Sequence, residues 1–177
     1  MTERSPVEPP FGHRHCRYCG GKMMVLSGER SLKIRCGACH RPDYINSKPC
    51  AEVIAATGGE ILLLRRSIEP FWGYWDIPGG FLEDGEHPED GARRELLEEA
   101  GIGIDIAGLI GIYIDEYPGE EKVHTVTLSF AGAPVGDPYP NDEADEVRYF
   151  PADRIPENLA FDHAKKVIED WRKSEFS

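Results

Sequence analysis

The stretch from residue 80 to residue 102 constrains the fold most, because it predicts a helix with one strongly acidic face. Pro88 suits the first turn of a helix, and Gly101 can take the left-handed conformation that ends one, which places the helix at residues 88–100. Three carboxylates at positions i, i+3 and i+4 share a face: Glu95, Glu98 and Glu99. Like charges this close repel each other, and hard divalent cations such as Mg²⁺ or Mn²⁺ relieve the repulsion.

The same stretch follows a fixed pattern of residues. It consists of Gly80, five residues, Glu86, seven residues and then the run Arg94-Glu95-Leu96-Leu97-Glu98-Glu99-Ala100-Gly101-Ile102. This pattern resembles the Nudix box, with every fixed position filled. An isolated glutamate cluster would be read as a solvated helix face, whereas the complete box favours a metal site. The resemblance implies a Nudix hydrolase with the α/β/α sandwich and mixed sheet of that family.

The resemblance also implies the roles of particular residues. The expected Mg²⁺ or Mn²⁺ ligands are the Gly80 carbonyl, Glu95, Glu98, Glu99 and a glutamate from a later acidic loop. Glu143 is the first candidate for that later ligand and Glu146 the second, with a solvated acidic loop as the alternative. Glu95 or Glu98 is expected to be the general base ahead of Glu143. Glu86 and Arg94 are expected to fix the loop and the carboxylates in the catalytic site.

A second pattern lies near the N-terminus, where two C-x₂-C pairs are separated by sixteen residues. The four thiols are Cys16, Cys19, Cys36 and Cys39. This spacing is typical of a tetrahedral structural Zn²⁺ site with a short hairpin between the two pairs. Disulfides or separately buried thiols are the alternatives. Disulfides fit a cytosolic chain poorly, and two pairs of cysteines within 24 residues fit chance burial poorly. Cys50 is expected to be buried in the first strand of the following domain.

These two patterns divide the chain. We expect a flexible tail at residues 1–12, a zinc ribbon at 13–48 and a Nudix hydrolase domain at 49–177. The ribbon should contain strands Met23–Leu26 and Leu32–Arg35, joined by a turn at Ser27–Arg30. It resembles the ribbon that precedes the Nudix domain of NADH pyrophosphatases, and we expect it to serve as a dimerisation element, giving a homodimer, or as a lid.

Hydrophobic patterning predicts the strands of the larger domain. They are expected at 51–57, 60–66, 104–115, 122–131 and 147–150, with a Gly/Pro-rich loop at 134–140 and a final amphipathic helix within 161–176. The apolar run Ile61–Leu64 implies a strand buried on both faces. Trp75 is expected to lie in the core.

Substrate contacts are less firmly encoded. Arg65 and Arg66 at the end of a strand can reach phosphate, although strand ends carry arginine routinely. Phe71 and Trp72 can stack on a base, with core packing as the alternative. Pro118 lies where ADP-ribose pyrophosphatases of the Nudix family have a proline, although any connecting turn can contain one. The NADH pyrophosphatase signature resembling SQPWPFPxS has no match here, so ADP-ribose or a similar nucleotide is the preferred substrate.

Charge limits the partners. Residues 1–50 carry nine Lys/Arg and four Asp/Glu, whereas residues 51–177 carry eleven and twenty-eight, which sums to the net charge of −12. So acidic a catalytic half attracts metal ions and disfavours a nucleic-acid backbone, and a dianionic nucleotide would have to arrive with cations or meet local Arg or Lys side chains. No membrane segment or signal peptide is expected, which predicts a cytoplasmic protein. The alternatives are a nucleotide-sensing regulator whose ribbon binds nucleic acid, and a hydrolase of NADH or RNA ends.

Overall fold

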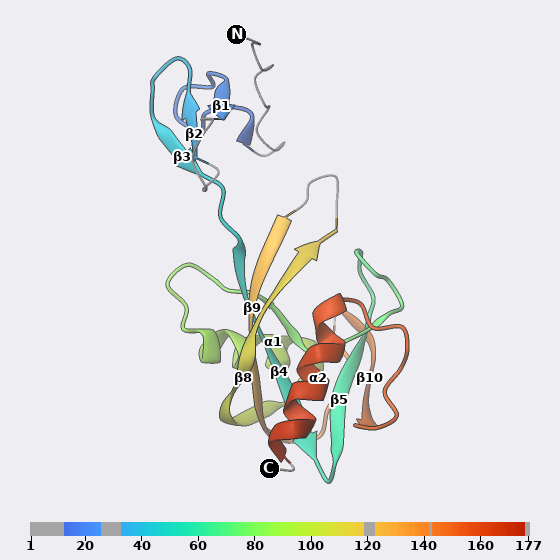
Figure 1. Cartoon of the computed structure of the whole chain (residues 1–177). Helices are drawn as coiled ribbons and strands as arrows, with labels where there is room; N and C mark the ends of the chain where they lie inside the picture. Colours follow the sequence, from blue (N-terminus) through green and yellow to red (C-terminus); the bar gives the residue numbers. More distant parts are fainter. Residues whose placement is uncertain (1–12, 26–32, 119–122, 142, 176–177) are drawn as a thin grey trace. The chain divides into compact units, whose positions relative to one another are not determined.

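The computed structural model describes residues 13–25, 33–118, 123–141 and 143–175, and these form two compact units (Figure 1). Of the described residues, the first unit contains those from 13 to 47 and the second contains those from 48 to 117 and from 124 to 175. The expected N-terminal tail and the expected turn at Ser27–Arg30 lie outside the described residues.

The N-terminal unit is a small antiparallel sheet. Its strands are β1 (Met23–Val25), β2 (Lys33–Cys36) and β3 (Pro42–Tyr44), in the order β1-β2-β3. Its buried cluster consists of Cys16, Met23, Ile34 and Cys36, with Val25 and Ile45 packed against it. So small an apolar cluster buries little surface, which fits a unit that needs an additional source of stability.

The larger unit is built on a mixed sheet. Its main strands are β4 (Lys48–Thr57), β5 (Glu60–Arg66), β8 (Gly103–Tyr117), β9 (Val123–Val135) and β10 (Ala144–Pro151), in the order β10-β5-β4-β9-β8. Strand β4 runs parallel to β9 and antiparallel to β5. Two short strands join this sheet, because β6 (Trp75–Asp76) pairs with β5 and β7 (Gly79–Phe81) pairs with β4.

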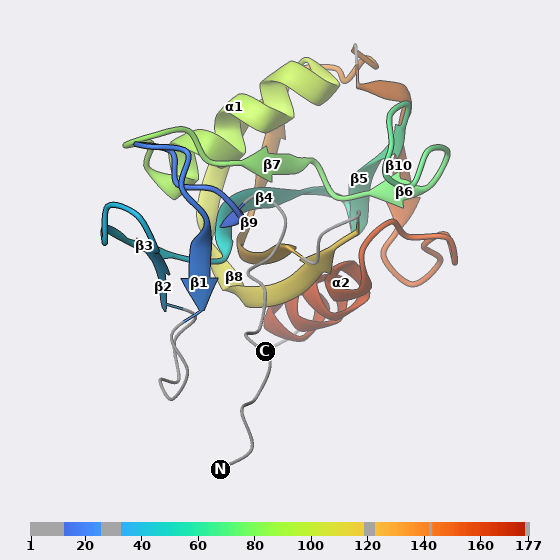
Figure 2. The same cartoon turned by 90° about the horizontal axis from the view of Figure 1, so that it is seen from above.

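A helix covers each face of the sheet, as Figure 2 shows with α1 (Pro88–Ala100) and α2 (Asp162–Glu175) on opposite sides. On the α1 side Leu62 packs with Val53 and Leu96, and on the α2 side Ile61 and Leu63 pack with Ile168 and Trp171. Alternate residues of β5 therefore enter different cores. The predicted burial of this strand on both faces and the predicted α/β/α sandwich are confirmed.

Local signals define α1. The His87 Nδ1 atom accepts a hydrogen bond from the Glu89 amide at 3.3 Å, and Pro88 occupies the first turn. The helix ends at Gly101, whose φ of 68° lies in the left-handed region and whose amide donates to the Leu97 carbonyl at 3.0 Å. The helix predicted at residues 88–100 is therefore confirmed.

Four strands are longer than predicted, among them β4, which begins at Lys48 instead of residue 51. β8 starts at Gly103 and ends at Tyr117, and β9 continues to Val135, so the predicted loop at 134–140 begins only at Gly136. β4 pairs with β9 only as far as Gly132, so Pro134 lies beyond the ladder with β4. β10 begins at Ala144 with a bulge before Glu146, so part of the predicted acidic loop belongs to the sheet.

In the described part of the chain, no helix combines the length and the apolar character that crossing a bilayer requires.

The end of α1 generates a stability prediction. A Cβ atom at Gly101 would collide with the Tyr139 ring, which would have to leave its place against the end of the helix. Gly58 also has a positive φ, of 59°, but a Cβ atom there would meet nothing within 4 Å. Gly58→Ala should therefore lower the free energy of unfolding only through left-handed backbone strain, by about 1 kcal/mol. Gly101→Ala should lower it by about 1–3 kcal/mol more, because of the collision. Urea unfolding of both variants checks this, and equal losses would contradict it.

Candidate active site

The acidic face of α1 lines a cavity of about 390 Å³. Glu95, Glu98 and Glu99 all line it, and so does Gly80 of β7. Glu99 is buried and its Oε2 atom accepts a hydrogen bond from the Gly79 amide at 2.9 Å. The structure thus brings the helical glutamates and the predicted backbone ligand to one cavity.

Two glycines allow this approach. In the ladder between β4 and β7, Gly79 lies opposite Glu52 and Gly80 lies opposite Ala51. A Cβ atom at Gly79 would collide with the backbone and Cβ atom of Glu52, and one at Gly80 would collide with the Glu95 carboxylate. Because neither glycine carries a side chain, β7 can lie between β4 and the acidic face of α1.

The negative charges of two carboxylates on this wall, Glu95 and Glu99, are only partly offset by their neighbours. Burial raises the pKa of Glu99 well above its usual value, against the hydrogen bond from Gly79, and neighbouring carboxylates raise it further. Burial likewise raises the pKa of Glu95, against the hydrogen bond and charge of Arg94. Oxygen donors that lie in a partly buried acidic cluster fit a hard divalent cation, which would relieve both costs.

Arg94 holds the acidic face together. Its Nε and Nη2 atoms donate to the two Glu86 oxygens at 2.8 and 2.9 Å, and its Nη1 atom donates to Glu95 at 2.8 Å and Glu98 at 3.1 Å. The hydrogen bonds from Arg94 lower the pKa of Glu86 to about 2. With these contacts Glu86 and Arg94 can fix the loop and the carboxylates, which is the supporting role expected of them from the sequence.

The other predicted site residues divide into two groups. Glu143 and Arg66 line the cavity. The remaining ones are not among its lining residues: Arg65, Phe71, Trp72, Pro118 and Glu146. Arg65 instead pairs with Glu146 at 3.4 Å. Trp72 is 66% exposed, and Phe71 packs against Phe161 with ring centroids 5.2 Å apart. Trp75 is buried, as expected for a core residue.

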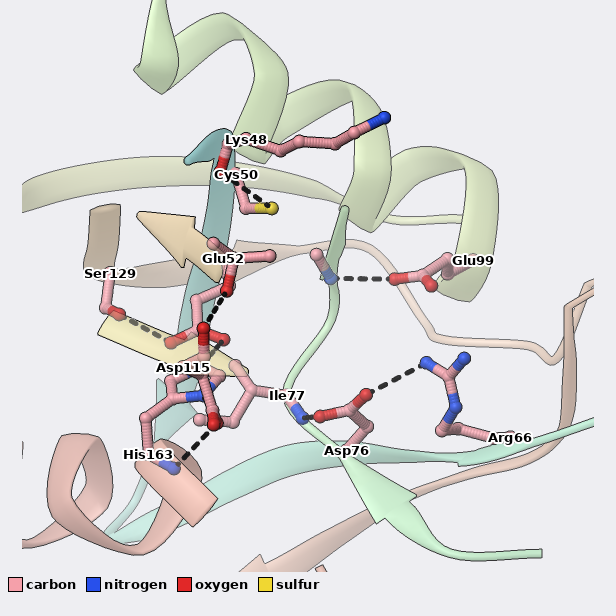
Figure 3. A network of polar contacts seen from close by, with 12 residues as sticks. Lys48, Cys50, Glu52, Arg66, Asp76, Ile77, Glu99, Asp115, Ser129 and His163 are labelled. Atoms are coloured by element: carbon pink, nitrogen blue, oxygen red, sulfur yellow. Dashed lines mark hydrogen bonds and ion pairs between the residues drawn. The ribbon is translucent and has the colours of Figure 1, made fainter. Parts of the chain in front are cut away.

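Sequence reasoning missed a buried polar network in the wall of the cavity (Figure 3). His163, at the start of α2, lies between two carboxylates: its Nδ1 atom is 2.8 Å from Asp115 and its Nε2 atom is 3.1 Å from Glu52. The second Glu52 oxygen accepts a hydrogen bond from Ser129. Burial alone would lower the pKa of His163, but Glu52 and then Asp115 raise it to about 9, so the imidazole is a cation at neutral pH.

A second missed pair lies beside this network. Arg66 donates to Asp76 at 3.0 Å, and both side chains are almost completely buried. Burial raises the pKa of Asp76 to about 7, with Arg66 opposing and Glu52 adding to the shift. One signal was available in the sequence, because Glu52 and Asp76 are charged residues within the apolar segments Ala51–Ala55 and Trp75–Ile77.

The four predicted cysteines come together in the N-terminal unit. The Sγ atoms of Cys16 and Cys39 lie 3.7 Å apart, and those of Cys19 and Cys36 lie 3.5 Å apart. All four Sγ atoms lie within 4.8 Å of one another, and no other group of this kind occurs among the described residues. Four thiols at this spacing match the donor set of a structural zinc site. The carboxylate oxygens of the three α1 glutamates do not lie as close together as these four sulfur atoms. Several of these oxygens accept hydrogen bonds from Arg94 and from the Gly79 amide.

Comparison with known proteins agrees with this geometry. The NUDIX domain model matches residues 49–171. An ADP-ribose pyrophosphatase of Methanocaldococcus jannaschii is 31% identical over 131 residues, covering 73% of this chain and 76% of that protein. The NAD-capped RNA hydrolase NudC of Stutzerimonas stutzeri is 31% identical over 147 residues, covering 81% of this chain and 50% of that protein.

A solved structure extends the similarity to the fold. The crystal structure of a NUDIX hydrolase from Nitrosomonas europaea has a TM-score of 0.79 and 29% identity, with 92% of each chain covered. The matching domain model, the sequence similarity and the acidic helix beside Gly80 agree. The chain belongs to the Nudix hydrolase family.

Proposed function

We propose that this enzyme hydrolyses the pyrophosphate bond of a nucleoside diphosphate linked to a second group, with ADP-ribose as the preferred substrate. The observation that carries the proposal is the single cavity that Glu95, Glu98, Glu99 and Gly80 line together. The choice of ADP-ribose is supported by the archaeal relative, which bears that activity in its name.

The residues of the cavity suit the chemistry. Glu95, Glu98, Glu99, the Gly80 carbonyl and Glu143 would hold Mg²⁺ or Mn²⁺, which would stabilise charge on the phosphoryl oxygens and lower the pKa of bound water. Glu95 and Glu98 are the candidates for the base that takes the proton of the attacking water. Arg94 restrains both carboxylates, because one of its nitrogens donates to each of them.

A second candidate function is hydrolysis of NADH or of an NAD-capped RNA. It is favoured by the four-cysteine cluster and by the similarity to NudC, of which this chain covers only half. Rates of release measured side by side for ADP-ribose, NADH, FAD, diadenosine polyphosphates and NAD-capped RNA separate the two. The proposal requires ADP-ribose to give the largest kcat/KM, and a larger value for NADH or capped RNA would replace it.

The acidic face generates a kinetic prediction. Glu98→Gln should lower kcat by about 10²–10⁴-fold, because it removes a metal ligand or the base while preserving the shape of the side chain. Glu89→Gln is the matched control, since Glu89 lies on the same helix and pairs with Arg93 at 3.2 Å outside the cavity. Steady-state hydrolysis with Mg²⁺ or Mn²⁺ checks both variants. Near-wild-type activity of Glu98→Gln would refute the metal and base assignments.

The cysteine cluster generates a prediction about metal content. We propose that it holds one structural Zn²⁺, and Cys36→Ser should reduce bound zinc to well below one equivalent, because three thiolates bind the ion far more weakly. Cys50→Ser is the matched control, since Cys50 does not belong to the cluster. Elemental analysis of the purified proteins gives the zinc content directly. Loss of zinc in both variants, or in neither, would contradict the assignment.

A further inference from the structure

Aromatic rings form a continuous row along one side of the cavity. Tyr117 stacks on Phe161 with centroids 5.8 Å apart and an interplanar angle of 28°. Phe81 lies 5.6 Å from Tyr117 on one side, and Phe71 lies 5.2 Å from Phe161 on the other. Phe81, Tyr117 and Phe161 line the cavity that also contains the α1 glutamates. The cavity therefore offers an aromatic surface as well as an anionic one.

Two parallel contacts hold this surface in place. Asp115 and Tyr117 are two residues apart on β8, and Phe161 and His163 are two residues apart at the start of α2. Tyr117 contacts Phe161, and Asp115 accepts hydrogen bonds from both the His163 amide at 3.2 Å and its Nδ1 atom. The ion pair therefore fixes the distance between the two segments that carry the stacked rings.

His163 has no ring nitrogen left for a ligand. Its two nitrogens face Asp115 and Glu52, which are themselves largely buried. Both N–H groups of the imidazolium are therefore paired with carboxylates in the wall of the cavity. Its position beside the cavity therefore does not make it a phosphate-binding group. The contacts instead tie β4, β8 and α2 to one another behind the aromatic row.

We propose that the Tyr117–Phe161 pair receives the planar base of the nucleotide, and that His163, bridging Asp115 and Glu52, is the positioning residue that holds this surface. The inference rests on the proposed function and specifies where one part of its substrate binds. A base is an uncharged aromatic ring that gains by stacking on other rings, whereas the diphosphate belongs at the metal-binding carboxylates. The surface lies on β8 and before α2, in place of the Phe71 and Trp72 side chains that the sequence suggested.

The direct test changes Tyr117. Tyr117→Ala should raise KM for ADP-ribose about 10-fold or more while kcat stays within about threefold of wild type, because the lost stacking acts on binding. It should weaken inhibition by AMP by a similar factor and leave inhibition by inorganic pyrophosphate, which has no base, unchanged. Tyr139→Ala is the matched control, since Tyr139 is a 56% exposed tyrosine of the same unit that does not line the cavity.

Binding of AMP, measured by calorimetry in the presence of Ca²⁺, separates this inference from the proposed function. Absence of hydrolysis by the wild type would count against the proposed function alone. The base surface would be overturned if wild-type protein did not bind AMP, if Tyr117→Ala bound it as tightly, or if AMP and pyrophosphate were weakened equally.

The positioning role of His163 has a pH signature. The pKa of His163 is about 9, so in the wild type KM for ADP-ribose should rise as pH passes through that value and the imidazolium is lost. The groups that face it are Glu52 from β4, Asp76 from β6, and Asp115 and Tyr113 from β8; the pKa of Asp76 is about 7 and that of Tyr113 about 12. None of these values coincides with the expected transition.

His163→Gln keeps a donor but has no charge to lose. Its KM for ADP-ribose should already be raised at neutral pH and should show no further rise around pH 9, with kcat little changed. The AMP affinity should fall and the pyrophosphate affinity should not. A KM transition that persists near pH 9 in His163→Gln, or equal weakening of AMP and pyrophosphate, would overturn the positioning role.

Discussion

Compensation of negative charge is the constraint on which the larger unit depends. Three helical glutamates, Glu143 and two further carboxylates of the wall line one cavity. Each group that offsets them comes from a different element: Arg94 from α1, the Gly79 amide from β7, Arg66 from β5 and His163 from α2. Removing any one of these elements would leave a carboxylate buried without its partner, which is strongly unfavourable. The fold and the acidic site therefore require one another.

The sheet makes this compensation possible because its central strand serves both helices. β4 carries Val53 and Ala55 into the core beneath α1, and Ile54 into the core beneath α2. Glu52 lies on the same strand, opposite Gly79 and within reach of His163. A single strand thus connects the side of the cavity that carries the α1 glutamates with the side that carries the aromatic rings.

How much could be predicted from the sequence depended on the range of the interactions. The helix α1 was predictable, because Pro88 and Gly101 act on their own neighbours in the chain, although the His87 cap was not foreseen. The cysteine cluster was predictable because zinc-site spacing is short and specific. The polar network was not, since Glu52 and His163 are 111 residues apart and meet only when β4 and α2 are assembled. The same reason explains why Tyr117, which lies beyond the strand predicted at 104–115, proved to line the cavity at the end of a longer strand.

The position of Cys50 has a consequence for how the enzyme tolerates oxidising conditions. This thiol was predicted to be buried, but it is half-buried and lines the cavity. Its partial burial, together with the charges of Glu52 and Glu95, raises its pKa to about 12. A thiol with such a pKa carries almost no thiolate at physiological pH, and the thiolate is the form that peroxides and alkylating agents attack. The negative charge around the cavity therefore also makes this thiol a poor target for oxidants and alkylating agents.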